Sequence, residues 1–133
     1  MHHLKGLRVA EEATLLARAV YRVTAALPAS ERRTLGDQMR RAAVSVYANI
    51  VEGHGRASPA DSRRFFDIAR ASLRELEAHA TFARSVGLAD PGLSDEIARR
   101  ALWTARLLTA LLASRTTPRP PAAAPPRPAP PRS

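Results

Sequence analysis

QMRRAAVSVYANIVEGHGR, residues 38–56, is the stretch that decides the fold. It carries most of a stripe of apolar side chains at spacings of four, three, four and four: Leu35, Met39, Ala42, Val46 and Ile50. This periodicity is typical of a helix that packs one face against other helices. Gly53 and Gly55 tolerate positive φ, so we expect Gly53 to end the helix in a left-handed conformation and to let the chain reverse.

A further helix is predicted directly after this turn, from about Pro59 to Val86. Ser58 can cap it, Pro59 suits its first turn, and Asp61 lies three residues after the cap. Gly87 is placed to cap its C-terminus. We expect an inner stripe of seven residues: Phe65, Ala69, Ser72, Leu73, Leu76, Ala80 and Ala83.

Two more amphipathic segments flank this pair. The first runs from about Arg8 to Ala26 and ends at Pro28, while the last runs from about Pro91 or Asp95 to Ser114. In the segment of about residues 34–52, Thr34 and Asp37 have the spacing of a cap and its partner. Because the connections are short, the sequence predicts an all-α fold, an antiparallel up-down-up-down four-helix bundle over residues 1–115.

The C-terminal residues 116–133 have a different composition. Eight prolines lie between Pro118 and Pro131, which removes backbone donors and favours an extended polyproline-like chain. We therefore expect a disordered Pro/Ala/Arg-rich tail. A solubilising spacer is favoured over a ligand for an aromatic-lined groove.

Several motifs together resemble a known family. They are Leu27-Pro28 with Glu31, residues 38–45, Asn49-Ile50 with Glu52-Gly53, Gly55-Arg56 with Ser58, and Ser72-Leu73 with residues 75–77. Over roughly residues 8–113 the chain resembles the four-helix-bundle proteins encoded in intervening sequences of bacterial 23S ribosomal RNA genes, the S23-type family. A more distant similarity is to the accessory protein of diversity-generating retroelements, a basic pentameric bundle that partners a reverse transcriptase. The resemblance implies a ring-like homopentamer.

Composition limits the classes of function. The chain of 133 residues is about 45% apolar, which suits one domain with a single core. Cysteine is absent, which excludes disulfides, thiolate zinc sites and cysteine nucleophiles. No apolar run reaches the length of a signal peptide core or a membrane span. We expect a soluble cytoplasmic protein with no membrane partner.

Positive charge is the strongest functional indication from composition. The net charge is +9; four of the 21 basic residues lie from Arg115 onward, so 17 remain against 12 acidic residues in the body. Almost all are arginine, whose planar fork binds phosphate in a bidentate manner. The candidate nucleic-acid-binding residues are Arg32, Arg33, Arg40, Arg41, Arg56, Arg63 and Arg64, with Arg99 and Arg100 as further positions. The three arginine pairs flank the connections around residues 34–52, so they could converge on one end or face.

Catalytic and metal-binding patterns are weak. Glu75 and His79 share a helix face, but the two Glu-x-x-His motifs of a dimetal bundle are missing. His54 is interpreted as an exposed loop histidine, and neither Ser45 nor Ser72 has a histidine base. The sequence predicts no catalytic residues, no metal site and no cofactor, and therefore a protein that is not an enzyme.

Polar residues and surplus apolar residues on the helices lead to two further hypotheses. Ser45, Asn49 and Glu52 are interpreted as structural, fixing helix register through hydrogen bonds across helices or to the Gly53 turn. A second apolar set lies beside the inner stripes and suggests a subunit interface. Its members are Val44, Tyr47, Val51, Trp103 and Leu107, with Leu102 beside them.

Two functions are consistent with these features. The first is a non-catalytic homo-oligomeric bundle that binds RNA or a ribonucleoprotein through arginine–phosphate contacts. The alternative is a protein-interaction scaffold, for example an accessory subunit for a reverse transcriptase, in which the charge serves solubility.

Overall fold

The computed structural model describes residues 2–116 and 126–132. Four long helices dominate it: α1 (His2–Ala25), α3 (Asp37–His54), α4 (Pro59–Ser85) and α5 (Pro91–Thr116). Between α1 and α3 the chain forms one short turn of helix, α2 (Ala29–Glu31), and a π-helical segment, η1 (Arg32–Gly36). The described residues contain no strand. The all-α four-helix bundle predicted from the sequence is confirmed.

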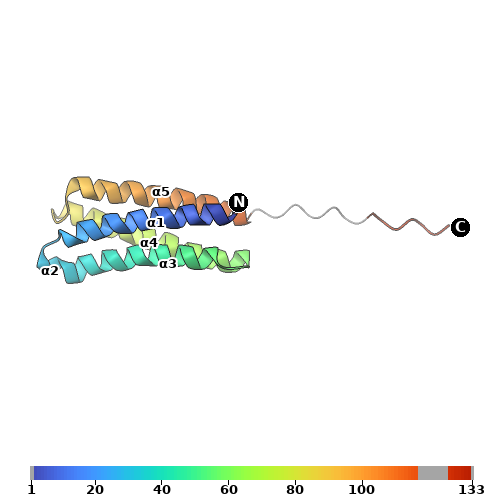
Figure 1. The fold of residues 1–133 in the computed structure, drawn as a ribbon, viewed down its shortest axis with the longest axis horizontal. Helices are drawn as coiled ribbons and strands as arrows, with labels where there is room; N and C mark the ends of the chain where they lie inside the picture. Colours follow the sequence, from blue (N-terminus) through green and yellow to red (C-terminus); the bar gives the residue numbers. More distant parts are fainter. Residues whose placement is uncertain (1, 117–125, 133) are drawn as a thin grey trace.

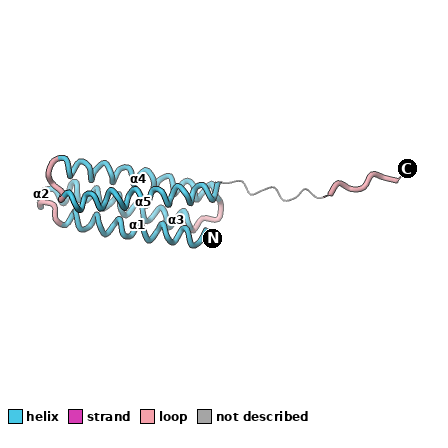
Figure 2. Tube along the Cα trace, turned by 90° about the horizontal axis from the view of Figure 1, so that it is seen from above, coloured by secondary structure: helices cyan, strands magenta, loops and turns pink. Residues whose placement is uncertain are grey.

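The helices run alternately up and down, and each packs against two neighbours (Figures 1 and 2). Helix α1 lies between α3 and α5, and α4 contacts the same two helices from the other side. The α3–α4 turn, the start of α1 and the end of α5 lie at one end of the bundle. The α1–α3 connection and the α4–α5 turn lie at the opposite end. We call these the tail end and the η1 end.

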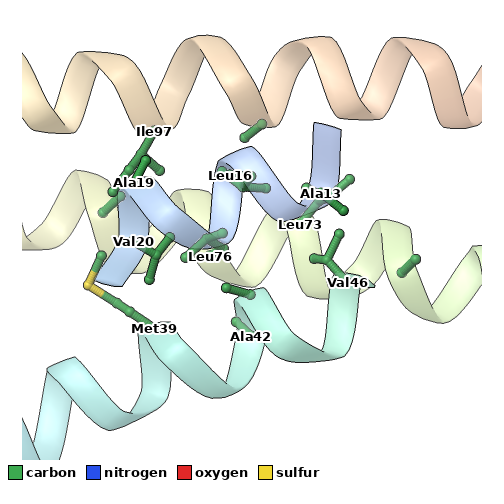
Figure 3. Packing of buried hydrophobic residues seen from close by; sticks show 14 of the residues in the cluster. Ala13, Leu16, Ala19, Val20, Met39, Ala42, Val46, Leu73, Leu76 and Ile97 are labelled. Carbon is green, nitrogen blue, oxygen red and sulfur yellow. The ribbon is translucent and has the colours of Figure 1, made fainter. Parts of the chain in front are cut away.

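The core is aliphatic and consists of the apolar stripes of the four helices (Figure 3). Close spacing of the helices is possible because alanines such as Ala13, Ala19 and Ala42 occupy core positions. One residue of the predicted stripe on α4 is wrong: Phe66 is fully buried, whereas Phe65 is only half-buried. The sequence pattern alone does not distinguish Phe65 from Phe66, because both are aromatic and adjacent. The rotation of α4 about its axis decides which of them points into the core.

The beginning of α3 differs from the prediction. Thr34 does not cap a helix, because it lies inside η1 and its hydroxyl bonds to the carbonyl oxygen of Glu31 at 3.2 Å. Helical structure starts earlier, directly after Pro28, and passes through the π-helical segment into α3. An insertion of this kind re-phases a helix, so it carries the buried Leu35 and Met39 onto the same core side.

The role of Gly53 also differs from the prediction. Gly53 is helical, and Gly87, with φ of 75°, is the residue with positive φ in the described part of the chain. A Cβ on Gly53 would lie 2.5 Å from Cε1 of Phe66 and 3.1 Å from the Ser62 carbonyl oxygen. The glycine is therefore required by the close approach of α4, and the Ser62 hydroxyl bonds to the Gly53 carbonyl oxygen at 2.8 Å.

Both ends of α4 follow the sequence prediction. The Asp61 amide donates to the Ser58 hydroxyl at 3.1 Å, which confirms Ser58 as the N-cap residue. At the C-terminus, Gly87 adopts the left-handed conformation that permits the chain to turn toward α5.

The segment after the bundle begins one residue later than predicted, because α5 continues to Thr116. Residues 126–132 have no helix or strand and are exposed. The predicted disorder of residues 117–125 lies outside the described residues. None of the described helices combines the length and the apolar character that crossing a bilayer requires.

Candidate nucleic-acid interface

The seven candidate arginines do not converge on one end of the bundle. Arg32, Arg33, Arg40 and Arg41 belong to η1 and the first turns of α3, at the η1 end. Arg56, Arg63 and Arg64 lie around the α3–α4 turn, at the tail end. From Arg41 to the end of α3 at His54 the helix advances 13 residues, so the two groups lie about 20 Å apart, because an α-helix rises 1.5 Å per residue.

Arg40 is held in place by groups of α1. Its Nε donates to the Thr24 hydroxyl at 2.7 Å, and its guanidinium lies over the Tyr21 ring with 4.4 Å between Cζ and the ring centroid. Thr24 is only 1% exposed and donates in turn to the Val20 carbonyl oxygen at 2.9 Å. Arg40 therefore contributes to the α1–α3 contact as well as to the charge of the surface.

The other arginines of the η1 end are less constrained. The Nε of Arg32 donates to the Leu27 carbonyl oxygen at 3.0 Å, which closes the turn after α1. Arg33 and Arg41 are exposed, and neither forms a hydrogen bond or an ion pair with a side chain among the described residues. Their guanidinium groups are available to an anion from solution.

At the tail end two arginines share one aromatic ring. The guanidinium groups of Arg56 and Arg64 lie 4.7 and 4.9 Å from the centroid of the Phe65 ring. Arg56 also pairs with Glu52 at 3.2 Å on the surface of α3. Arg63 is exposed and has no carboxylate within ion-pair distance in the described part of the chain.

Ion pairs concentrate on the faces that include α5. Glu96 accepts from Arg22 at 2.6 Å and from the Nε of Arg100 at 3.2 Å, which joins α1 to α5. Burial by itself raises the pKa of Glu96, but the hydrogen bonds and charges of Arg100 and Arg22 outweigh it, so the pKa lies below its usual value. Arg84 pairs with Asp95 between α4 and α5. Arg100 is therefore neutralised locally and is a poor phosphate ligand.

The predicted interface residues fall on two separate faces. Val44, Tyr47 and Val51 are 43–49% exposed and follow one side of α3, next to Tyr21 of α1. Trp103 is 41% exposed on the face between α1 and α5, where Arg8 lies over its ring at 5.7 Å. We call the two surfaces the α1/α3 face and the Trp103 face. Of the remaining pair, Leu107 packs against the core and Leu102 is exposed.

The polar residues of α3 make the contacts expected of structural groups. The hydroxyls of Ser45 and Ser72 are 2.8 Å apart, which links α3 to α4. Asn49 donates to the Ser45 carbonyl oxygen at 2.8 Å and to its hydroxyl at 3.1 Å, and Glu52 pairs with Arg56.

The histidines lie in different surroundings. His54 is half-buried at the end of α3 rather than exposed in a loop: a Cβ on Gly6 of α1 would lie 2.0 Å from its Nδ1. His79 lies 3.4 Å from Glu75 on α4. No group of three or more potential metal ligands occurs among the described residues.

Two aromatic residues of this surface were not predicted as functional. Tyr21 and Phe65 each carry a stacked guanidinium. Arg64 precedes Phe65 directly, which is a weak sequence indication, but Tyr21 is 19 residues from Arg40 and only the packing of α1 against α3 joins them.

Comparison with known proteins agrees with this fold. Residues 5–110 match the 23S rRNA-intervening sequence protein family. The chain belongs to this family. A crystal structure of a protein of unknown function from the S23 ribosomal protein family of Bacteroides thetaiotaomicron superposes with a TM-score of 0.75 at 19% identity. The match covers 82% of this chain and 98% of that one, and at this identity it shows the fold alone. Comparison with curated proteins gave no match.

Proposed function

We propose that this family member is a non-catalytic, homo-oligomeric basic bundle that binds RNA through arginine–phosphate contacts. The observation that carries the proposal is the lack of carboxylate partners for the candidate arginines. Among the described residues, only one of the seven, Arg56, forms an ion pair. The other six keep an uncompensated charge: Arg32, Arg33, Arg40, Arg41, Arg63 and Arg64.

The contrast with the rest of the bundle supports this interpretation. Arg22, Arg70, Arg84 and Arg100 lie within 4.0 Å of carboxylates, as expected for arginines that serve surface stability. An unpaired guanidinium releases counterions from nucleic acid when it contacts a phosphate. Stacked arginine–aromatic pairs at each end of α3 also suit unpaired bases, which stack on aromatic rings and on guanidinium planes.

Exposed apolar or aromatic side chains on two separate faces support self-association into a ring. A closed ring larger than a dimer joins different surfaces of neighbouring copies, and such an interface needs two patches on each copy. The α1/α3 face exposes several apolar side chains, and the Trp103 face exposes the Trp103 ring among Glu12, Glu96, Arg99 and Arg100. We propose that Tyr47 and Val51 of the α1/α3 face of one copy pack on the Trp103 face of the next, in the ring of five copies that the family resemblance implies. Tyr21 and Val44, nearer the η1 end, then stay open to solvent.

A polypeptide partner is the second candidate, and the α1/α3 face favours it. Tyr21, Val44, Tyr47 and Val51 are each 43–49% exposed, and apolar residues gathered in this way are typical of protein interaction sites. This scaffold function uses the same face as the proposed ring. Whether a second copy of the chain covers the α1/α3 face therefore decides between the two functions.

The RNA proposal predicts a salt dependence that the arginines control. Replacing Arg33 and Arg41 together with Gln should reduce the slope of log K against log salt by about one to two units on single-stranded RNA. Both residues are exposed and lack side-chain partners in the described structure, so the unfolding free energy should change by less than about 0.5 kcal/mol. Binding titrations at several salt concentrations measure the slope.

The matched control removes two arginines that already have carboxylate partners. Arg22 and Arg84 bind Glu96 and Asp95, so their replacement with Gln should leave the slope within about half a unit of the wild-type value. Equal slopes for wild type and for the Arg33/Arg41 variant would contradict the proposed contacts.

The ring proposal predicts that two monomeric variants assemble when they are mixed. Tyr47→Glu and Trp103→Glu each replace the aromatic side chain of one of the two faces with a charge, so each variant alone should be monomeric. An equimolar mixture should form heterodimers and nothing larger, because each variant keeps the face that the other has lost. Light scattering measures the mass against the 14.4 kDa of one chain.

A different result would replace the ring. If Trp103→Glu keeps the wild-type oligomer while Tyr47→Glu abolishes it, the interface is a symmetric one that uses the α1/α3 face alone. If the wild type is a monomer at micromolar concentration, the α1/α3 face is free and the polypeptide-scaffold function takes precedence.

A further inference from the structure

A hollow of about 510 Å³ lies between α1 and the first half of α3, beside Val44 of the α1/α3 face. Its lining comes from Tyr21 of α1 and from five residues of α3: Asp37, Arg40, Arg41, Val44 and Ser45. The volume lies within the range of small-ligand sites in proteins. The hollow is open to solvent and carries one aromatic ring, two guanidinium groups and one carboxylate.

Arg40 provides a fixed planar surface in this hollow. Its Nε is bonded to the buried Thr24 hydroxyl at 2.7 Å, and one face of its guanidinium rests on the Tyr21 ring. These two contacts define the plane of the guanidinium before any ligand arrives. A planar aromatic base can stack on an arginine held in this way without the entropy cost of ordering the side chain.

Two unpaired charges border this surface. Asp37 and Arg41 are one helical turn apart and line the same hollow, yet no ion pair joins them or binds either to another described side chain. The Asp37 carboxylate offers two acceptor oxygens, and the Arg41 guanidinium offers only donors. A ligand that fits both needs a pair of N–H donors on one side and an anionic group on the other.

We propose that this hollow binds one unstacked nucleotide of single-stranded RNA and prefers guanine. The base stacks on Arg40, the Asp37 carboxylate accepts hydrogen bonds from the base edge, and Arg41 binds the adjacent phosphate. The inference rests on the proposed RNA function and deepens it, because it assigns one position of base preference to an otherwise sequence-independent interaction.

The preference for guanine follows from the geometry of a carboxylate. Guanine presents N1–H and the N2 amino group side by side, so both carboxylate oxygens can accept in a bidentate pair. Uracil presents a single N3–H on that edge, and adenine and cytosine each place a ring nitrogen acceptor beside their amino group. In adenine and cytosine that ring nitrogen would face a lone pair of the Asp37 carboxylate. These two bases therefore form one hydrogen bond fewer than guanine and are also repelled.

The test uses full-length protein and three end-labelled heptanucleotides, UUUGUUU, UUUIUUU and UUUUUUU, where I is inosine. Inosine keeps N1–H but lacks the N2 amino group. Wild type should bind the guanine oligonucleotide at least about fivefold more tightly than the uridine one, with inosine between them. Fluorescence anisotropy at constant low salt measures the three dissociation constants.

Three variants identify the groups responsible. Asp37→Asn should bring the guanine-to-uracil ratio close to one, whereas Asp61→Asn, which changes a first-turn carboxylate of α4 outside the hollow, should leave the ratio unchanged. Arg40→Lys keeps the charge but loses the stacking plane, so it should lower the ratio and leave the salt slope as in wild type.

The outcomes separate this inference from the RNA function. Equal binding of the three oligonucleotides by wild type refutes the guanine pocket and leaves RNA binding standing. If none of them binds, the RNA function fails, and the pocket is tested directly with guanosine monophosphate and uridine monophosphate at millimolar concentration. Only the guanine nucleotide should shift the NMR signal of the Arg40 Nε–H group, and an unchanged signal refutes the pocket as well.

Discussion

Phe66→Ala should lower the free energy of unfolding by about 3–5 kcal/mol, whereas Phe65→Ala should lower it by about 1 kcal/mol or less. Phe66 has no exposed surface and packs in the core against Gly53, so its removal leaves a large cavity. Phe65 is half-buried and loses mainly its contacts with two surface guanidinium groups. Urea denaturation followed by circular dichroism measures both values.

If Phe66→Ala does not fold, leucine variants at the two positions provide the same comparison. Phe66→Leu keeps most of the side-chain volume and should cost roughly 1–2 kcal/mol, still more than Phe65→Leu. Equal costs at the two positions, or a larger cost at position 65, would contradict the helix phase of α4 described above.

Gly53→Ala should destabilise the bundle by about 1–3 kcal/mol, although alanine is the better helix former. The new methyl group would lie 2.5 Å from Cε1 of Phe66, and the backbone oxygen of Ser62 lies at 3.1 Å on the other side. Neither neighbour can withdraw without moving α4 away from α3. Thermal and urea denaturation of the variant measure the loss.

Gly55→Ala is the matched control for this prediction. Gly55 has a φ of −79°, and the nearest atom to an added Cβ is the Val51 carbonyl oxygen at 3.6 Å. The substitution should therefore be neutral or stabilise by about 0.4–1 kcal/mol, because it restricts the unfolded chain. A Gly53→Ala protein as stable as the Gly55→Ala protein would show that α3 and α4 are not in close contact at this point.

The sequence predicted the parts of the fold that depend on local rules. The stripes through Ile50 and Leu108 follow helical periodicity, and the caps at Ser58 and Gly87 follow the chemistry of helix ends. These features need no knowledge of which helices are neighbours. The number of helices and their antiparallel order could therefore be derived without the structure.

The errors occurred where a neighbouring helix decides the outcome. A glycine at position 53 can serve a left-handed turn or the close approach of another helix. In this structure the close approach of Phe66 on α4 requires it. The π-helical η1 shifts the phase of the chain before α3, which no residue pattern indicates. His54 is half-buried because the distant Gly6 leaves space for its ring.

The candidate site could be predicted only as a set of residue types. Composition indicated arginine as the candidate binding residue, but the division into two ends follows from the length of α3, and the pairing of Arg40 with Tyr21 follows from tertiary packing. The same holds for the carboxylates: only the structure distinguishes Arg100, which is bound to Glu96, from the unpaired Arg41. Partner choice among charged side chains is a property of the folded surface.

We expect the folded bundle itself, rather than the C-terminal segment alone, to bind RNA. The most direct measurement compares the affinity of three full-length proteins for single-stranded RNA at about 50 mM salt. They are wild type, a body variant with Arg33, Arg41 and Arg63 changed to Gln, and a tail variant with Arg119, Arg127 and Arg132 changed to Gln. We predict that the body variant loses more affinity than the tail variant and that its salt slope falls by about two units. RNA binding that survives in the body variant and disappears in the tail variant would contradict the account.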